Sequence, residues 1–88
     1  MVKIVFWDVA ECDLAKLPRS VRRALLLGCQ EIFDDWAIGK PLSRTLTGYR
    51  MHRVGVYRII YTVRGSSSIE IVAIGHRKDI YDRAARGK

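Results

Sequence analysis

From Gly48 to Gly75 the chain is an almost continuous β region, and this feature restricts the fold more than any other. Valine, isoleucine and tyrosine are frequent there, and these residue types favour strands. Two turn signals interrupt the region, one at Val54-Gly55 and one at residues 65–68. The predicted strands are residues 49–53, 56–64 and 69–75. An antiparallel meander commonly packs one face against another element and leaves the other face to solvent.

The covering element is predicted earlier in the chain, where residues 18–36 have helical periodicity. Apolar residues recur there every three or four positions and would share one helix face: Leu17, Val21, Leu25, Cys29, Ile32 and Trp36. Pro18 suits the first turn of this helix, because the N–H that proline lacks has no helical partner there. A strand at residues 2–9 and a short helical turn at residues 10–16 precede the helix, and a loop at residues 39–47 follows it.

These elements predict a single two-layer α+β domain over residues 1–88. Its order is an N-terminal strand, one short and one long helix, a three-stranded antiparallel meander and a short C-terminal helical turn. Side chains alternate along the middle strand. One set is Tyr57, Ile59, Tyr61 and Val63, and the other is Val56, Arg58, Ile60, Thr62 and Arg64. We expect the helix to cover one face of the sheet and solvent to cover the other.

The chain is strongly basic: 16 lysines and arginines against 9 aspartates and glutamates give a net charge of +7. Such a surface attracts nucleic acid, an acidic protein or anionic lipid, and charge alone does not select among them. No apolar run is long enough to span a membrane, and no signal peptide is recognisable. Because Cys12 and Cys29 form no C-x-x-C motif, zinc and redox motifs are absent and we expect free thiols. Without a membrane span or a signal peptide we expect a cytoplasmic protein. We expect neither a metal nor another cofactor.

Three residues in the second half are candidates for chemistry: Arg58 in mid-strand, Arg77 where the last strand ends, and Tyr81 four residues later. Each has a simpler explanation in isolation. Arg58 could be a solvated charge on a strand, Arg77 could form an ion pair with Asp79, and Tyr81 could be a packing residue near the terminus. In a meander, however, the strand that ends at Gly75 lies beside Arg58, so the next segment can fold back there. The resulting cationic, aromatic groove would suit single-stranded RNA, because guanidinium groups bind phosphates and phenol rings stack on bases.

Three segments of the second half carry motifs. They are Gly48-Tyr49-Arg50, Arg53-Val54-Gly55-Val56-Tyr57-Arg58-Ile59-Ile60-Tyr61 and Ile74-Gly75-His76-Arg77-Lys78-Asp79-Ile80-Tyr81. Together they resemble the RelE branch of the RelE/ParE toxin superfamily, whose members share an R-V-G-x-Y-R-x-x-Y hairpin and a G-H-R-x-x-x-Y ending. The opening strand, the Leu-Pro start of the long helix and the overall length also fit, so the resemblance spans the whole chain.

The resemblance implies a RelE-like fold and a toxin of a type II toxin–antitoxin system that cleaves messenger RNA without a metal. Arg58 would then bind the scissile phosphate, Arg77 would stabilise the charge of the transition state, and Tyr81 would be the general base toward the ribose 2′-hydroxyl. The surrounding positive charges would favour the phenolate form of Tyr81. Further RNA-binding residues would be Arg50, His52, Arg53, His76 and Lys78.

One departure from the family pattern concerns two lysines, spaced by one residue, which some RelE members carry on the strand before the hairpin turn. Counting back from Arg58 without gaps puts Tyr49 and Met51 at these positions, whereas matching by chemistry gives Arg50 and His52. If the gapless count holds, the mechanism relies more strongly on the two residues of the C-terminal ending.

The resemblance also implies partners. A cognate acidic antitoxin, RelB-like, would cover the basic groove, and the message would be cut in the ribosomal A site. Operator DNA would be bound only through the antitoxin, and no membrane would be involved. Two other activities remain open: a ParE-like toxin that inhibits DNA gyrase, and a non-catalytic nucleic-acid-binding member. Among RNA-cleaving mechanisms, the imidazoles of His52 and His76 form a rival acid–base pair.

Overall fold

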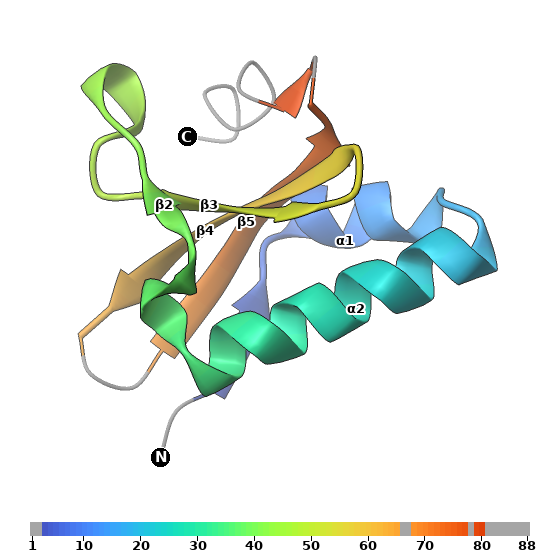
Figure 1. The fold of residues 1–88 in the computed structure, drawn as a ribbon, viewed down its shortest axis with the longest axis horizontal. Coiled ribbons are helices and arrows are strands. Elements are labelled where there is room, and N and C mark those ends of the chain that lie inside the picture. The colour runs from blue at the N-terminus through green and yellow to red at the C-terminus, as the bar shows by residue number, and fades with distance from the viewer. Residues whose placement is uncertain (1–2, 66–67, 78, 81–88) are drawn as a thin grey trace.

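A computed structural model describes residues 3–65, 68–77 and 79–80. The helices are α1 (Asp8–Ala15) and α2 (Arg19–Asp34), with 3-10 turns η1 (Trp36–Ile38) and η2 (Arg44–Leu46). The strands are β1 (Lys3–Phe6), β2 (Lys40–Pro41), β3 (Arg50–Val54), β4 (Tyr57–Arg64) and β5 (Ser68–His76). The two helices lie on one side of the sheet, so the predicted two-layer α+β architecture is confirmed (Figure 1). In these residues, no helix has the length and apolar character needed to cross a membrane.

The sheet has five strands in the order β1-β5-β4-β3-β2. Its centre is the predicted antiparallel meander of β3, β4 and β5. β1 adds to one edge by pairing parallel to β5, and the two-residue β2 adds to the other edge by pairing antiparallel to β3. The prediction of an N-terminal strand and a three-stranded meander therefore missed one strand, because β2 lies within the predicted loop.

The N-terminal strand is shorter than predicted, because a helix begins two residues after the strand ends. β1 ends at Phe6, and Trp7 keeps extended backbone angles while its N–H donates to the Ile71 carbonyl at 2.9 Å. α1 then begins at Asp8, with Glu11 also in its first turn, where negative charge complements the helix dipole. The predicted strand over residues 2–9 was wrong at its end for this reason.

The predicted long helix is confirmed, although it stops at Asp34. Asp35 takes extended backbone angles, and its carboxylate accepts a hydrogen bond from the Ala37 N–H at 3.2 Å. Trp36 consequently falls in η1 and is 50% exposed, so it does not continue the apolar face of the helix.

The main core lies between α2 and the sheet. Leu25, Cys29 and Ile32 of α2 are buried against Ile59 and Tyr61 of β4. α2 approaches the sheet closely at Gly28, where a Cβ atom would lie 2.7 Å from Val54 Cγ2. Glycine at this position therefore sets the distance between the two layers.

A second, smaller core covers the middle of the opposite sheet face, which was predicted to be solvated. It consists of the buried residues Leu46, Ile60, Val72, Ala73 and Ile80, and we call it the second core. A β-bulge in β5 creates part of it: Ile60 pairs with Ala73 and Tyr61 pairs with Ile71, which leaves Val72 as an extra residue. Since Val72 and Ala73 both belong to this core, the bulge supplies two successive apolar side chains to one face.

Candidate functional site

Strand register assigns the predicted site residues to the two faces of the sheet. Arg58 on β4 lies opposite Arg53 on β3 and opposite Gly75 on β5. Directly paired residues point to the same side of a sheet. Arg53 and Arg58 therefore share the face that carries the second core, at the end nearer the β3–β4 turn, and we call this the arginine face.

Arg77 follows β5 and extends this face. Its backbone N–H donates to the carbonyl of Val56 at 3.0 Å, so the residue continues the pairing one step beyond His76. It lies two positions after Gly75, the partner of Arg58, which makes Arg58 and Arg77 diagonal neighbours within reach of long side chains. The Arg77 side chain is exposed.

The segment after Arg77 folds back over the same face of the sheet. The Asp79 N–H donates to the His76 carbonyl at 3.0 Å, and Ile80 is fully buried in the second core. The fold-back anticipated from the sequence is thus present up to Ile80. The predicted site residues Lys78 and Tyr81, and most of the predicted C-terminal helical turn, lie outside the described residues.

Arg58 is half-buried, and one of its guanidinium nitrogens, Nη1, lies 3.5 Å from the Met51 sulfur. Within residues 3–65, 68–77 and 79–80, no carboxylate lies within ion-pair distance of Arg53, Arg58 or Arg77. This includes Asp79, so the alternative of an Arg77–Asp79 ion pair is not realised. Three guanidinium groups on one face, none of them neutralised by a described carboxylate, form a site suited to an anion such as a phosphate.

Arg50 and His52 lie on the other face of β3, toward the helices, and both have partners within the protein. The Arg50 guanidinium lies 5.0 Å from the centre of the Trp36 ring and donates to the Gly39 carbonyl at 2.7 Å. His52 Nε2 lies 3.0 Å from the Glu31 carboxylate on α2. The structure therefore does not bring Arg50 and His52 together with Arg58.

His76 also lies on the helix-facing side of the sheet. It pairs with Tyr57, and the two rings meet edge to face with their centres 6.2 Å apart. Tyr57 itself packs against the main core. The two histidines that could form an acid–base pair are consequently on the face opposite Arg58.

The positions filled by lysines in some RelE members can now be compared on the same basis. Met51 pairs with Ile60, a member of the second core, and so faces the same side as Arg58. Tyr49, which packs against that core, lies on this side as well. Tyr49 and Met51, the residues of the gapless count, thus lie on the side of Arg58, whereas Arg50 and His52 lie on the other side.

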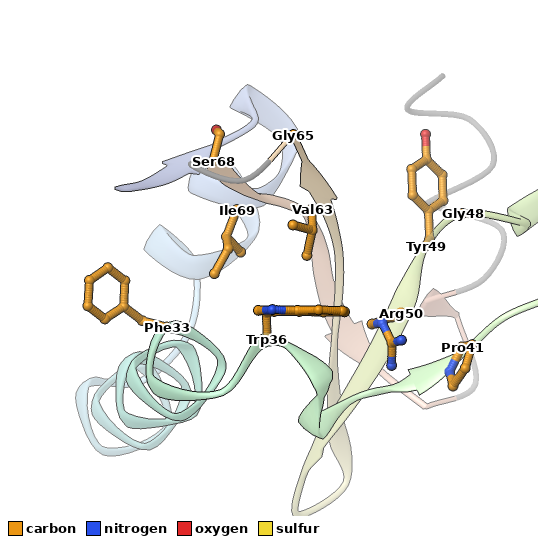
Figure 2. Close-up of a pocket in the computed structure, with 10 residues that line it drawn as sticks. All are labelled: Phe33, Trp36, Pro41, Gly48, Tyr49, Arg50, Val63, Gly65, Ser68 and Ile69. Atoms are coloured by element: carbon orange, nitrogen blue, oxygen red, sulfur yellow. The ribbon is translucent and has the colours of Figure 1, made fainter. Parts of the chain in front are cut away.

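A pocket of about 650 Å³ is a separate feature and lies at the other end of the sheet. Figure 2 shows the Trp36 ring in its middle, with Val63 and Ile69 on one side and Arg50 beside it. The Tyr49 ring points away from Trp36 (Figure 2). Arg50 is the one predicted site residue among the lining residues. Sequence analysis missed this pocket, because its walls come from segments far apart in the chain.

Three groups in the described part of the chain have shifted pKa values. Cys29 and Tyr61 lie in the main core, and Glu70 lies on the same side of the sheet as Arg58 but toward the opposite end. Burial raises the pKa of the Cys29 thiol to about 11, and burial also raises the pKa of the Tyr61 phenol, against the hydrogen bond from Gly39 and the charge of Arg50. A hydrogen bond from the Trp7 indole, helped by Arg64, lowers the pKa of Glu70. Within the described residues, no cluster of three or more histidine, cysteine, aspartate or glutamate side chains could hold a metal ion.

Comparison with known proteins identifies the family. A sequence profile described as "ParE toxin of type II toxin-antitoxin system, parDE" matches residues 4–81. The chain belongs to the RelE/ParE toxin superfamily. The toxin RelG of Mycobacterium tuberculosis (strain ATCC 25618 / H37Rv) is 34% identical over 84 residues, which are 89% of this chain and 93% of RelG. The family predicted from the hairpin and ending motifs is thus confirmed.

Solved structures of other RelE-like proteins share the fold. A chain of the toxin–antitoxin complex RelBE2 from Mycobacterium tuberculosis superposes with a TM-score of 0.79 at 29% identity, covering 86% of this chain and 98% of that chain. A mutant of the Escherichia coli toxin RelE in the free state gives a TM-score of 0.78 at 19% identity, with coverage of 97% and 95%. At that identity the second likeness concerns the fold alone.

Proposed function

We propose that this toxin is an endoribonuclease that acts in the cytoplasm and cleaves messenger RNA in the ribosomal A site. The observation that carries the proposal is the arginine face, where Arg58 lies between Arg53 and Gly75 and diagonal to Arg77, without a described carboxylate partner. RNA contains its own nucleophile, the ribose 2′-hydroxyl, next to each phosphodiester. Cleavage therefore requires only removal of a proton and stabilisation of negative charge.

The reaction forms a bond from the 2′-oxygen to phosphorus and breaks the bond from phosphorus to the 5′-oxygen. The products are a 2′,3′-cyclic phosphate and a 5′-hydroxyl. In our proposal Arg58 binds the scissile phosphate, Arg77 stabilises the charge that develops on it, and Tyr81 accepts the 2′-hydroxyl proton. The 5′-oxygen takes up a proton from solvent. All three residues belong to the motifs shared with RelE-type toxins.

The surroundings of Arg58 support a role in stabilising charge. The side chain is half-buried beside the second core, where water is partly excluded. Electrostatic interactions are stronger in such an environment than in bulk water. A guanidinium held there can stabilise a phosphate more effectively than one on a long exposed side chain.

We also propose that a cognate acidic antitoxin, RelB-like, inhibits the toxin by covering the arginine face, and that operator DNA is bound only through this antitoxin. The net charge of +7 favours an acidic partner. The related RelBE2 toxin of Mycobacterium tuberculosis is known as part of a toxin–antitoxin complex.

The test is cleavage of a defined message on purified ribosomes, with mapping of the cut and of the terminal phosphate. Arg58→Gln should reduce the cleavage rate at least about 100-fold, the usual effect of removing one stabilising donor. Arg64→Gln is the matched control, because Arg64 lies on the same strand and face but is bound to Glu70 at 3.0 Å. It should stay within about threefold of the unmodified toxin, since exposed ion pairs contribute little.

Two further variants, Arg77→Gln and Tyr81→Phe, separate chemistry from binding. Each should slow cleavage far more than it weakens binding to the ribosome. Equal losses in Arg58→Gln and Arg64→Gln would mean that cleavage depends on overall charge alone. If messages stay intact and supercoiling by DNA gyrase is inhibited, the nuclease proposal is wrong and the protein is a gyrase-directed toxin.

A further inference from the structure

Met51 has an unusual relation to Arg58. Apart from Met1 it is the only methionine in the sequence, and it lies on β3 diagonal to Arg58, with its sulfur 3.5 Å from Arg58 Nη1. Met51 is half-buried and packs against the second core. The sulfur is thus attached to a side chain that the protein already holds in place.

Arg58, Arg64 and Arg50 differ in the groups that accept their hydrogen bonds. Arg64 is bound to the carboxylate of Glu70, and Arg50 donates to the carbonyl of Gly39 at 2.7 Å. Both of these arginines have strong acceptors, and Arg64 is also neutralised. A thioether is a weak and uncharged acceptor. A contact of this kind leaves Arg58 its full charge and most of its five N–H donors.

We propose that Met51 is a positioning residue, whose sulfur holds the Arg58 guanidinium in the orientation that binds phosphate without competing for it. This inference rests on the proposed function. A flexible arginine loses conformational freedom when it binds a ligand, and a side chain that is already ordered loses less. A carboxylate at position 51 would order Arg58 equally well but would compete with the phosphate for the same donors.

The first test examines Arg58 without RNA. Met51→Leu removes the sulfur and keeps the side chain close to its original volume. ¹⁵N relaxation of the Arg58 Nε–H group, compared in the unmodified toxin and in Met51→Leu, measures how strongly the guanidinium is ordered. Its order parameter should fall in Met51→Leu and stay unchanged in Leu46→Met, a similar exchange within the second core. An unchanged order parameter in Met51→Leu overturns the proposal, whether or not the toxin cleaves RNA.

The second test uses a double-mutant cycle on binding of a short single-stranded RNA whose 2′-hydroxyl at the cleavage site is replaced by hydrogen. Met51→Leu should weaken binding about two- to tenfold, the effect of ordering one flexible side chain. In an Arg58→Gln background the same substitution should have no effect, because its target is absent. Equal losses in both backgrounds would show that Met51 acts only through packing, and would overturn the proposal.

The two proposals fail in different ways. If the toxin leaves messages intact on the ribosome but Arg58 loses order in Met51→Leu, the nuclease function is wrong and the positioning role stands. If the toxin cleaves its message and Met51→Leu matches it in both Arg58 order and RNA affinity, the positioning role is wrong and the nuclease stands. Urea unfolding of each variant verifies that the folded state is fully populated during these measurements.

Discussion

Tyr61→Phe should be one of the most destabilising single-atom deletions in this toxin. Tyr61 is fully buried, and its hydroxyl group donates to the Trp36 carbonyl at 2.6 Å and accepts from the Gly39 N–H at 2.9 Å. These two hydrogen bonds attach the chain after α2 to the centre of the sheet. They also fix the position of Gly39, where a Cβ atom would overlap the Tyr61 ring.

The magnitude follows from the groups left behind. Removing the hydroxyl leaves a buried N–H at Gly39 and a partly buried carbonyl at Trp36 without their partners. Each unsatisfied buried group costs about 1–3 kcal/mol, with the lower end for the group that water can reach. The free energy of unfolding should therefore fall by about 2–4 kcal/mol. That is a large part of the stability of a domain of this size.

Urea unfolding followed by tryptophan fluorescence or circular dichroism measures this loss. Tyr57→Phe is the matched control, because Tyr57 lies on the same strand and face, and its hydroxyl has no hydrogen-bond partner within the part of the chain that the structure describes. The control should change stability by less than about 0.5 kcal/mol. If Tyr61→Phe costs no more than Tyr57→Phe, the reasoning about the buried hydroxyl is refuted.

Two other predictions concern the contact between α2 and the sheet. Gly28→Ala should destabilise the toxin by about 1–3 kcal/mol through overpacking against Val54, although alanine favours the helix by about 1 kcal/mol; a variant that unfolds at higher urea than the original would contradict this. The pKa of Cys29, raised from 9.0 to about 11 by burial, predicts a loss of stability in alkali. Above pH 9 the unfolded chain releases the thiol proton while the native chain retains it, so stability should fall by up to about 1.4 kcal/mol per pH unit until pH 11. Cys29→Ala should flatten this slope, as measured by urea unfolding at several pH values, and an unchanged slope would assign it to other groups.

The sequence predicted those parts of the fold that depend on local pattern. Alternation along residues 57–64 identified β4, and helical periodicity identified α2, because each pattern is repeated over many residues. Two features had no local signal. The two-residue β2 exists only because it pairs with β3, and the parallel pairing of β1 depends on where β5 lies after the rest of the chain has folded.

The site was predictable in part for the same reason. Arg58 and Arg77 could be brought together from the sequence, because consecutive strands pair and the last strand ends at His76. The sheet faces on which Arg50 and His52 lie could not be predicted, because a shift of one residue in strand pairing moves a side chain to the opposite side of a sheet. Register decides the matter, and here it is set by a turn at residues 55–56, where Gly55 has a φ angle of +62°.

The distribution of charge over the sheet gives an argument for function that is independent of the family. Arg53 and Arg58 lie directly opposite each other, and like charges in that arrangement destabilise a sheet. At the other end of β4 the same face has a basic residue too, but Arg64 is neutralised by Glu70. At the end nearer the β3–β4 turn, by contrast, no described carboxylate lies within ion-pair distance of Arg53 or Arg58. Stability alone would favour a carboxylate opposite Arg58, so the arrangement is better explained by an anion that binds there and offsets the repulsion.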